Sequence, residues 1–183
     1  MSGNQAGCRG PVHRHCLNMR RITREELALC QEVVEVEMPY AAFVAKFGEK
    51  HADHPPDWDA PGPVELWFFA LPWGQRIALE YHLAIGQFTI HLEVLEIDAV
   101  LDYLELRDAP RYLHQGIIEL LKSRCPRFFK GLGTFHLYRQ DDNGNKALMR
   151  SYESRRVADY YQKQYEDRGH RQLYWVEPAH AEP

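Results

Sequence analysis

Glutamate and histidine recur at alternate positions in two neighbouring segments of the chain. Glu80 and His82 lie in residues 75–83, and His91 lies in residues 87–94. Two imidazoles beside a carboxylate can bind a divalent metal ion or transfer protons in acid–base catalysis. The same residue types also occur on solvent-exposed sheet faces and in patches that bind another protein. The chemistry that is open to them depends on the elements that position these side chains.

Three closely spaced runs of β-branched and aromatic residues predict an antiparallel meander. They cover residues 64–71, 75–83 and 87–94. In the second and third runs, apolar residues alternate with polar ones, which predicts one buried face and one polar face. We therefore predict a central sheet over residues 64–94 that turns its apolar side to the core.

The register of this meander follows from keeping the apolar residues of neighbouring strands on one side. We predict tight turns at residues 73–74 and 85–86, which place Phe68 opposite Leu79. On the polar face this register gives two cross-strand rows: Trp67, Glu80 and His91, and Glu65, His82 and Thr89.

The polar face is the main candidate for function. Exposed aromatic rings among polar groups often mark interfaces, so Trp67 favours protein binding over a plain solvated surface. A helix covering this face would remove that interpretation. Residues 49–63 form an acidic loop with four prolines and a tryptophan between two aspartates, and such long loops are often functional. The predicted partner-binding residues are Asp53, Asp57, Trp58, Asp59, Glu65, Trp67, Glu80, His82 and His91.

The segments around the meander predict helices and further strands. Thr23 and Glu26 form a capping-box sequence, which predicts a helix that ends before Pro39, and a short helix follows at Tyr40–Phe47. Three more helices are predicted: residues 97–106, 110–124 and 154–168. A hairpin is predicted around residues 141–145, and a last strand at residues 172–177. The predicted fold is α+β: an antiparallel sheet, made of the meander, the C-terminal hairpin and the last strand, covered by helices.

The rest of the chain predicts little regular structure. Residues 1–21 are expected to be a disordered N-terminal extension, because they are polar and lack periodicity. Residues 22–178 are expected to form a single domain, and residues 179–183 a frayed tail.

Two further groups of potential metal ligands lie outside the sheet. Cys8, His13, His15 and Cys16 have a spacing that matches no closed structural zinc site. The loop residues His51 and His54 lack the helical H-E-x-x-H pattern of zinc proteases. We therefore expect no metal ion and no other cofactor.

Composition excludes several classes of protein. The chain has 183 residues, 45% of them hydrophobic, which suits one domain with a real core. Its formal net charge of −4 argues against a general nucleic-acid binder. No apolar run reaches the length of a membrane span, and we expect no signal peptide. Four scattered cysteines favour free thiols in a reducing cytoplasm.

Three functional hypotheses remain. The composition favours a non-catalytic protein-binding module, most concretely a bacterial inhibitor of the immunity or antitoxin type. Its acidic groups would face the basic cleft of a toxin or enzyme domain. The alternative is a small hydrolase or acyltransferase that uses Glu80, His82 and His91, although no glycine-rich acyl-carrier loop is visible. The third is a structural subunit that forms a homodimer through the edge strand at residues 172–177. The balance favours binding over catalysis.

Overall fold

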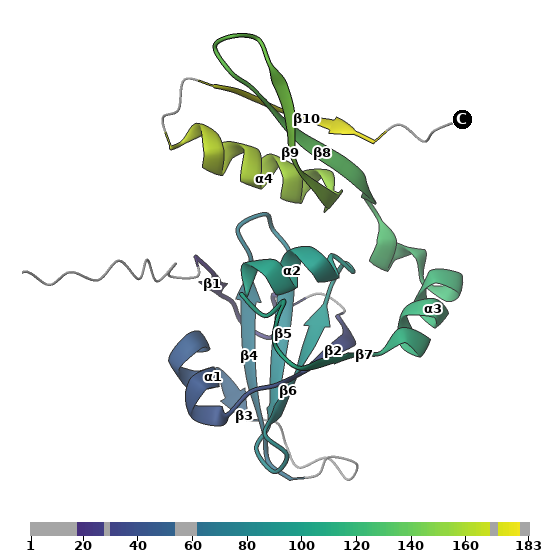
Figure 1. Cartoon of the computed structure of the whole chain (residues 1–183). Helices are drawn as coiled ribbons and strands as arrows, with labels where there is room; N and C mark the ends of the chain where they lie inside the picture. Colours follow the sequence, from purple (N-terminus) through teal and green to yellow (C-terminus); the bar gives the residue numbers. More distant parts are fainter. Residues whose placement is uncertain (1–17, 28–29, 54–61, 169–171, 180–183) are drawn as a thin grey trace, which may run out of the picture.

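The computed structural model describes residues 18–27, 30–53, 62–168 and 172–179. It confirms the predicted α+β class and resolves the strands into two antiparallel sheets (Figure 1). The predicted meander lies in a seven-stranded sheet, whereas the C-terminal hairpin and last strand form a separate three-stranded sheet.

The large sheet has the order β1-β4-β5-β6-β2-β7, and β3 also pairs with β4. Its strands are β1 (Arg20–Arg21), β2 (Gln31–Glu37), β3 (Ala52–Asp53), β4 (Val64–Ala70), β5 (Arg76–His82), β6 (Gln87–Leu92) and β7 (Arg111–Leu113). Although β2 precedes the meander in sequence, it lies between β6 and β7. The strand β1 falls in the segment that we assigned to the N-terminal extension, so the folded part of the chain begins earlier than predicted.

Helix α1 (Tyr40–Phe47) has the predicted bounds and covers one face of the large sheet. Its apolar side buries Phe43 and Phe47. The Phe43 ring lies 4.7 Å from the rings of both Trp67 and Phe88, measured between centroids. The helix ends at Gly48. Its φ of 81° lies in a region that glycine adopts without strain, because glycine lacks a Cβ atom.

The prediction of a helix that begins at Thr23 and ends before Pro39 is wrong. Thr23 and Glu26 do form the capping-box hydrogen bonds, at 2.9 and 3.4 Å, but they close a single turn. The strand β2 follows, because the β-branched residues Val33, Val34 and Val36 pack well on a sheet and poorly in a helix. Likewise, the predicted helix at 110–124 is split into β7 and α3 (Gln115–Arg124).

The register between β4 and β5 also differs from the prediction. Phe68 lies opposite Ala78 rather than Leu79, because the connection is a longer turn closed by the hydrogen bond from Leu71 N–H to the Gln75 carbonyl (2.7 Å). A shift of one residue exchanges the two faces of a strand. Trp67 therefore lies under α1 and is 0% exposed, and the predicted polar rows containing Trp67 and Glu65 are wrong.

Between β5 and β6 the predicted faces are right, but the alignment is displaced by two residues. Tyr81 lies opposite Phe88. Glu80 lies opposite Thr89, whereas the prediction placed it opposite His91. The turn is longer than the predicted two residues, and Gly86 occupies the left-handed region with φ 69°. Because the displacement is even, Glu80 and His91 still point to the same side of the sheet.

The C-terminal half forms the small sheet and its helix. The sheet has the order β10-β8-β9, with strands β8 (Leu132–Gln140), β9 (Lys146–Ser154) and β10 (Leu173–Pro178). Helix α4 (Arg155–Glu166) packs on this sheet, and the Ser154 hydroxyl caps it by accepting the Val157 N–H (3.3 Å). Along the chain, α2 (Ile97–Tyr103), α3 and the short 3-10 helix η1 (Pro126–Phe129) come between β6 and β8. Figure 1 shows α2 between the two sheets and α3 beside the large sheet.

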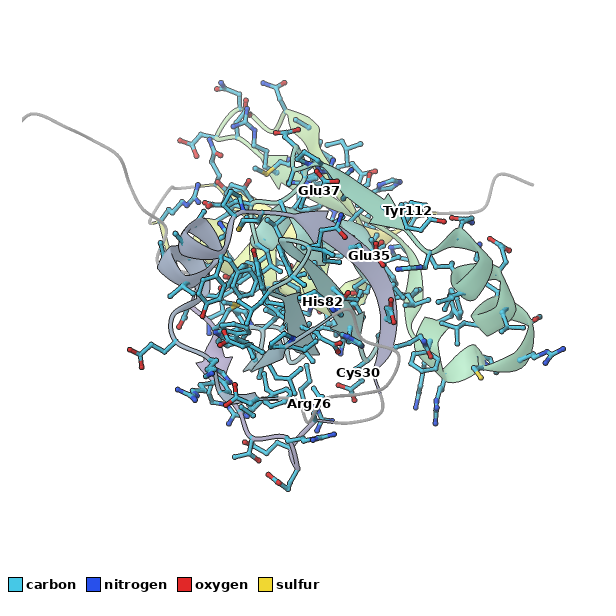
Figure 2. The ribbon with its side chains drawn as sticks, turned by 90° about the horizontal axis from the view of Figure 1, so that it is seen from below. Cys30, Glu35, Glu37, Arg76, His82 and Tyr112 are labelled. Atoms are coloured by element: carbon cyan, nitrogen blue, oxygen red, sulfur yellow. The ribbon has the colours of Figure 1, made fainter. Side chains whose placement is uncertain are left out.

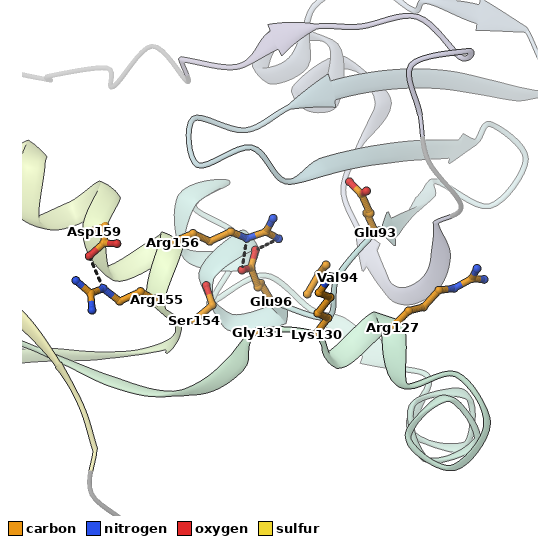
Figure 3. A pocket seen from close by; sticks show the side chains of 10 residues that line it. All are labelled: Glu93, Val94, Glu96, Arg127, Lys130, Gly131, Ser154, Arg155, Arg156 and Asp159. Atoms are coloured by element: carbon orange, nitrogen blue, oxygen red, sulfur yellow. Dashed lines mark hydrogen bonds and ion pairs between the residues drawn. The ribbon is translucent and has the colours of Figure 1, made fainter.

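A buried ionic network joins the two halves (Figure 3). The Glu96 carboxylate, in a residue that is 0% exposed, accepts two hydrogen bonds from Arg156 at 2.6 and 2.8 Å. It also accepts the Trp73 indole N–H at 2.9 Å. Arg156 donates to the Gln75 side chain at 2.5 Å, and Gln75 donates to the Val94 carbonyl at 2.7 Å. Helix α4 is thereby tied to the turn between β4 and β5.

Candidate functional site

Glu80, His82 and His91, three of the predicted site residues, come together on the face of the large sheet opposite α1. The Glu80 carboxylate lies between the two imidazoles, with Oε2 3.2 Å from His91 Nε2 and Oε1 3.5 Å from His82 Nε2. His91 lies diagonally across from Glu80, because Ala78 and Thr89 occupy the directly opposed positions. All three side chains are partly buried.

A bulge in β2 adds two carboxylates to this face. Glu32 lies opposite His91, and Glu35 lies opposite Thr89, with a register shift between Glu32 and Val34. Residues three apart in a regular strand point to opposite faces. The extra residue at the bulge removes this alternation and directs both Glu32 and Glu35 to the side of His91.

His114 completes the cluster from the end of β7. Its backbone N–H donates to the Val33 carbonyl at 3.0 Å, and its ring meets the Tyr112 ring edge-on, with 5.1 Å between centroids. His114 Nε2 lies 3.1 Å from Glu35 Oε1 and 3.3 Å from Glu32 Oε1. We name the resulting surface the carboxylate–imidazole face, which consists of Glu32, Glu35, Glu80, His82, His91 and His114.

The charges on this side of β2 are unbalanced. Within the described residues, Glu32, Glu35 and Glu37 form no ion pair with a lysine or an arginine. Other carboxylates at the large sheet do, since Glu65 pairs with Lys50 at 2.9 Å. Figure 2 shows Glu35, Glu37 and His82 with Tyr112, which lies opposite Glu35 in the register. The face therefore carries an excess of negative charge.

The imidazoles keep unused hydrogen-bonding capacity. His82 Nδ1, His91 Nε2 and His114 Nε2 are buried atoms that form no hydrogen bond to any described residue. The nearby carboxylates are within ion-pair distance of the two Nε2 atoms but form no hydrogen bond with them. Buried polar atoms usually have a partner. A face of this kind can take up a proton, a metal ion or a polar group of another molecule.

The same side of the sheet is apolar over β4. Val64, Leu66 and Phe68 are buried there with Ala78 and Ile22 in a second, smaller core. The side of the sheet opposite α1 is thus divided into an apolar part over β4 and the carboxylate–imidazole face over β5, β6, β2 and β7.

The structure places the other predicted site residues elsewhere. Glu65 accepts hydrogen bonds from the Tyr40 hydroxyl (2.6 Å) and Lys50 (2.9 Å) on the α1 side. Asp53 is exposed on β3, where it pairs with Lys50 at 2.5 Å. Trp67 is in the core and donates its indole N–H to the Gly48 carbonyl at 3.0 Å. Asp57, Trp58 and Asp59 lie outside the described residues.

His51 from the acidic loop has a structural contact. Its Nδ1 accepts the backbone N–H of Phe68 at 2.9 Å, so the imidazole must be neutral at that nitrogen. Burial, with a smaller contribution from the nearby Arg21, lowers the pKa of His51 to about 4. This histidine completes the hydrogen bonding of the edge of β4.

Sequence reasoning missed Glu32, Glu35 and His114, because it assigned all three to helices. One signal was available: from position 34 to 37, Val and Glu alternate strictly, which indicates a strand with one acidic face. The capping box upstream favoured a helix and overrode that signal. Nothing in the local sequence of His114 indicates its partners, because they come from a strand about eighty residues earlier.

Fold and site together define a mixed α+β protein with two antiparallel sheets, of which the larger presents a carboxylate–imidazole face. No family model matches the sequence, and neither a curated protein nor a solved structure gives a match. Among the described residues, no helix combines the length and the apolar character that crossing a membrane requires. Function is therefore inferred from the site alone.

Proposed function

We propose that the protein is a non-catalytic binding module that recognises a basic protein through the carboxylate–imidazole face. The observation that carries this proposal is the row Glu32, Glu35 and Glu37 on β2, which has no lysine or arginine partner among the described residues. Such a row attracts a partner with the opposite charge, and complementary charges raise the association rate and select the partner.

The surroundings of this row suit an interface. Tyr112 is 62% exposed and lies opposite Glu35, so an aromatic ring stands at the edge of the carboxylates. Tyrosine and arginine are enriched among the residues that dominate binding energy. A partner arginine could stack on the Tyr112 ring while its guanidinium donates to a glutamate. Tyr112 takes the role of aromatic anchor that the sequence analysis gave to Trp67.

The most concrete form of the proposal is an inhibitor of the immunity or antitoxin type that acts in the bacterial cytoplasm and blocks a basic toxin or enzyme domain. The formal net charge of −4 supports it. So do the free thiols of Cys30 and Cys125, which suit a reducing compartment. The proposal includes no cofactor for partner binding, no nucleic acid and no membrane. Self-association through β10 remains an additional proposal, because β10 lies at the edge of the small sheet.

The proposal is tested by charge reversal on β2. The wild-type chain should capture a partner with an isoelectric point above about 9 from a lysate of its host. With that partner purified, the double variant Glu35→Lys and Glu37→Lys should bind at least tenfold more weakly, chiefly through a slower association rate that also falls with salt.

The matched control is Glu119→Lys, because Glu119 is an exposed glutamate of α3 that pairs with Lys122 and contacts no residue of the face. This variant should bind as the wild type does. Equal affinity of the double variant and the wild type would contradict the proposal, as would a captured partner with an acidic surface.

A second candidate function, a small hydrolase or acyltransferase, is favoured by the position of Glu80 between two imidazoles. A carboxylate that orients a histidine is a common arrangement for general base catalysis. Because Glu80 Oε2 lies 3.2 Å from His91 Nε2, His91 would act as the base through its other ring nitrogen, Nδ1. Ester and thioester hydrolysis that is lost in both Glu80→Gln and His91→Ala, but kept in His136→Ala, would favour this alternative over the binding module.

A further inference from the structure

We propose that Glu32, Glu35 and His114 form a binding site for a divalent transition-metal ion such as Zn²⁺. This proposal stands apart from partner binding, because it rests on the geometry of three ligand atoms. One oxygen from each carboxylate and one ring nitrogen all lie within 4.8 Å of one another. The pair His114 Nε2 and Glu35 Oε1 is 3.1 Å apart, and His114 Nε2 and Glu32 Oε1 are 3.3 Å apart.

These separations match the spacing of ligands around one ion. With metal–ligand bonds of about 2.0–2.2 Å, two ligand atoms are roughly 3.0 Å apart at a right angle and roughly 3.4 Å apart at a tetrahedral angle. The two imidazole–carboxylate separations therefore suit one shared ion, and the two carboxylate oxygens lie within 4.8 Å of each other. The backbone already holds the ligands on one side of β2.

Two features fix the ligands before any ion binds. The bulge in β2 directs Glu32 and Glu35 to the same side, and bulges of this kind often re-aim side chains beside functional sites. His114 is held by its backbone hydrogen bond to Val33 and by the edge of the Tyr112 ring. Rigid supporting contacts are what metal sites require of their surroundings.

The electrostatics of the cluster require a positive charge. A carboxylate oxygen only accepts hydrogen bonds, and an unprotonated imidazole nitrogen does the same. Three such atoms converge here, and His114 Nε2 is buried without a hydrogen bond to a described residue. A metal ion bound to all three atoms would relieve the repulsion between them.

The ligand types indicate the kind of ion. One imidazole and two carboxylates suit zinc, cobalt, iron or manganese, whereas calcium takes six to eight oxygen ligands. Three protein ligands leave at least one coordination position open, as in catalytic rather than structural zinc sites. His91, opposite Glu32 in the register, stands beside the site with a buried Nε2 of its own.

The test is a calorimetric titration of the full chain, without a purification tag, with Zn²⁺. All proteins in the test carry the substitutions Cys8→Ser, Cys16→Ser, His13→Ala and His15→Ala, so that the N-terminal cysteines and histidines supply no ligand. This background protein should bind one ion per chain. The further change His114→Ala should weaken binding by more than the roughly 10–100-fold that loss of an outer-shell partner produces.

Matched controls separate the site from general histidine and carboxylate binding. His136→Ala removes an exposed histidine of the small sheet that pairs with Ser151, and it should leave the affinity unchanged. Glu32→Gln and Glu35→Gln should each weaken binding at least tenfold. Titration with Co²⁺ adds a spectroscopic readout, in which the visible bands should lack thiolate-to-cobalt charge transfer and should disappear in His114→Ala.

Two outcomes would overturn the metal site. One is the absence of saturable binding by the background protein, and the other is an affinity in His114→Ala equal to that of the background protein. Both are independent of the partner experiment, because Zn²⁺ binding is measured on the isolated chain. A failure of the protein-binding proposal would therefore leave the metal result standing, and the reverse also holds.

Discussion

The molecule contains two clusters of ionisable side chains, and they differ in whether an arginine pairs with the carboxylates. In the network around Glu96, the buried carboxylate receives hydrogen bonds from Arg156 and Trp73, so its negative charge has a positive partner. On the carboxylate–imidazole face, glutamates face histidines rather than lysines or arginines, and three ring nitrogens lack a hydrogen bond among the described residues.

The difference separates a structural cluster from a candidate functional one. A charge is tolerated in a protein interior only when it is paired and hydrogen-bonded, and the Glu96 network meets this condition while joining the two halves. The carboxylate–imidazole face is only partly buried, and its β2 glutamates form no ion pair with a lysine or an arginine among the described residues. Its unused capacity is available to a partner or an ion.

The largest effect is expected from breaking the Glu96 network. Arg156→Ala leaves the buried Glu96 carboxylate without its positive partner and should lower the free energy of unfolding by about 3–5 kcal/mol. Urea denaturation measures this loss. Arg155→Ala is the matched control, because Arg155 forms an exposed pair with Asp159 whose removal should change stability by at most about 1 kcal/mol. Equal losses of stability in the two variants would contradict the structural role of the Glu96 network.

A smaller effect is expected from Glu153, which lies close to this network. Burial, with the nearby Asp98 and Glu96 charges, raises the pKa of Glu153 to about 7, although the Ala99 N–H donates to its carboxylate at 3.0 Å. Between the ordinary glutamate pKa and pH 7, the unfolded chain is ionised here while the folded chain still holds the proton. Stability should therefore fall as pH rises through this window, by about 3 kcal/mol.

Glu153→Gln isolates this contribution, because glutamine cannot ionise and still accepts the Ala99 N–H. Thermal unfolding of both proteins should be followed from pH 4.5 to pH 8. The variant should lose less stability than the wild type as pH rises, and it should be the more stable protein at pH 8. Parallel pH profiles would contradict the assigned pKa.

The smallest effect is expected on the carboxylate–imidazole face. Glu35→Gln removes one of two neighbouring negative charges whose contacts are to a histidine, so stability should change by at most about 0.5 kcal/mol or should rise slightly. Urea denaturation at low and high salt measures the change. A loss of stability comparable to that of Arg156→Ala would show that the face stabilises the fold. This result would contradict its proposed role in binding a ligand.

Elements with strong local signals were predicted well. The proline and glycine at the ends of α1 and the Asn-Gly turn between β8 and β9 each identified an element and its approximate bounds. These features act over a few residues, so one sequence contains all the information that they need.

The register of β4 could not be predicted from the sequence. Every residue from Val64 to Phe69 is buried, because one side packs under α1 and the other packs in the second core. Without alternation, the parity of the strand is undetermined, and the assumption of a two-residue turn decided it wrongly. Trp67 moved from the predicted surface to the core for this reason.

The candidate site was half predicted. Glu80, His82 and His91 were found because alternation in β5 and β6 sets their side of the sheet. Glu32, Glu35 and His114 were not found, because their positions depend on the pairing of β2 with β6 and β7 and on an irregularity within β2. Such long-range pairing leaves no trace in a short window of sequence.

Because of the bulge in β2, the side of the sheet to which Glu32 points depends on the number of residues in this strand. If one valine were deleted there, the strand would regain its two-residue repeat, and Glu32 would turn toward the apolar interior beneath α1 and α2. A bare carboxylate is poorly tolerated in such surroundings. The site could thus be lost through the removal of a residue that supplies no ligand atom, while replacement of the same valine by isoleucine would leave it intact.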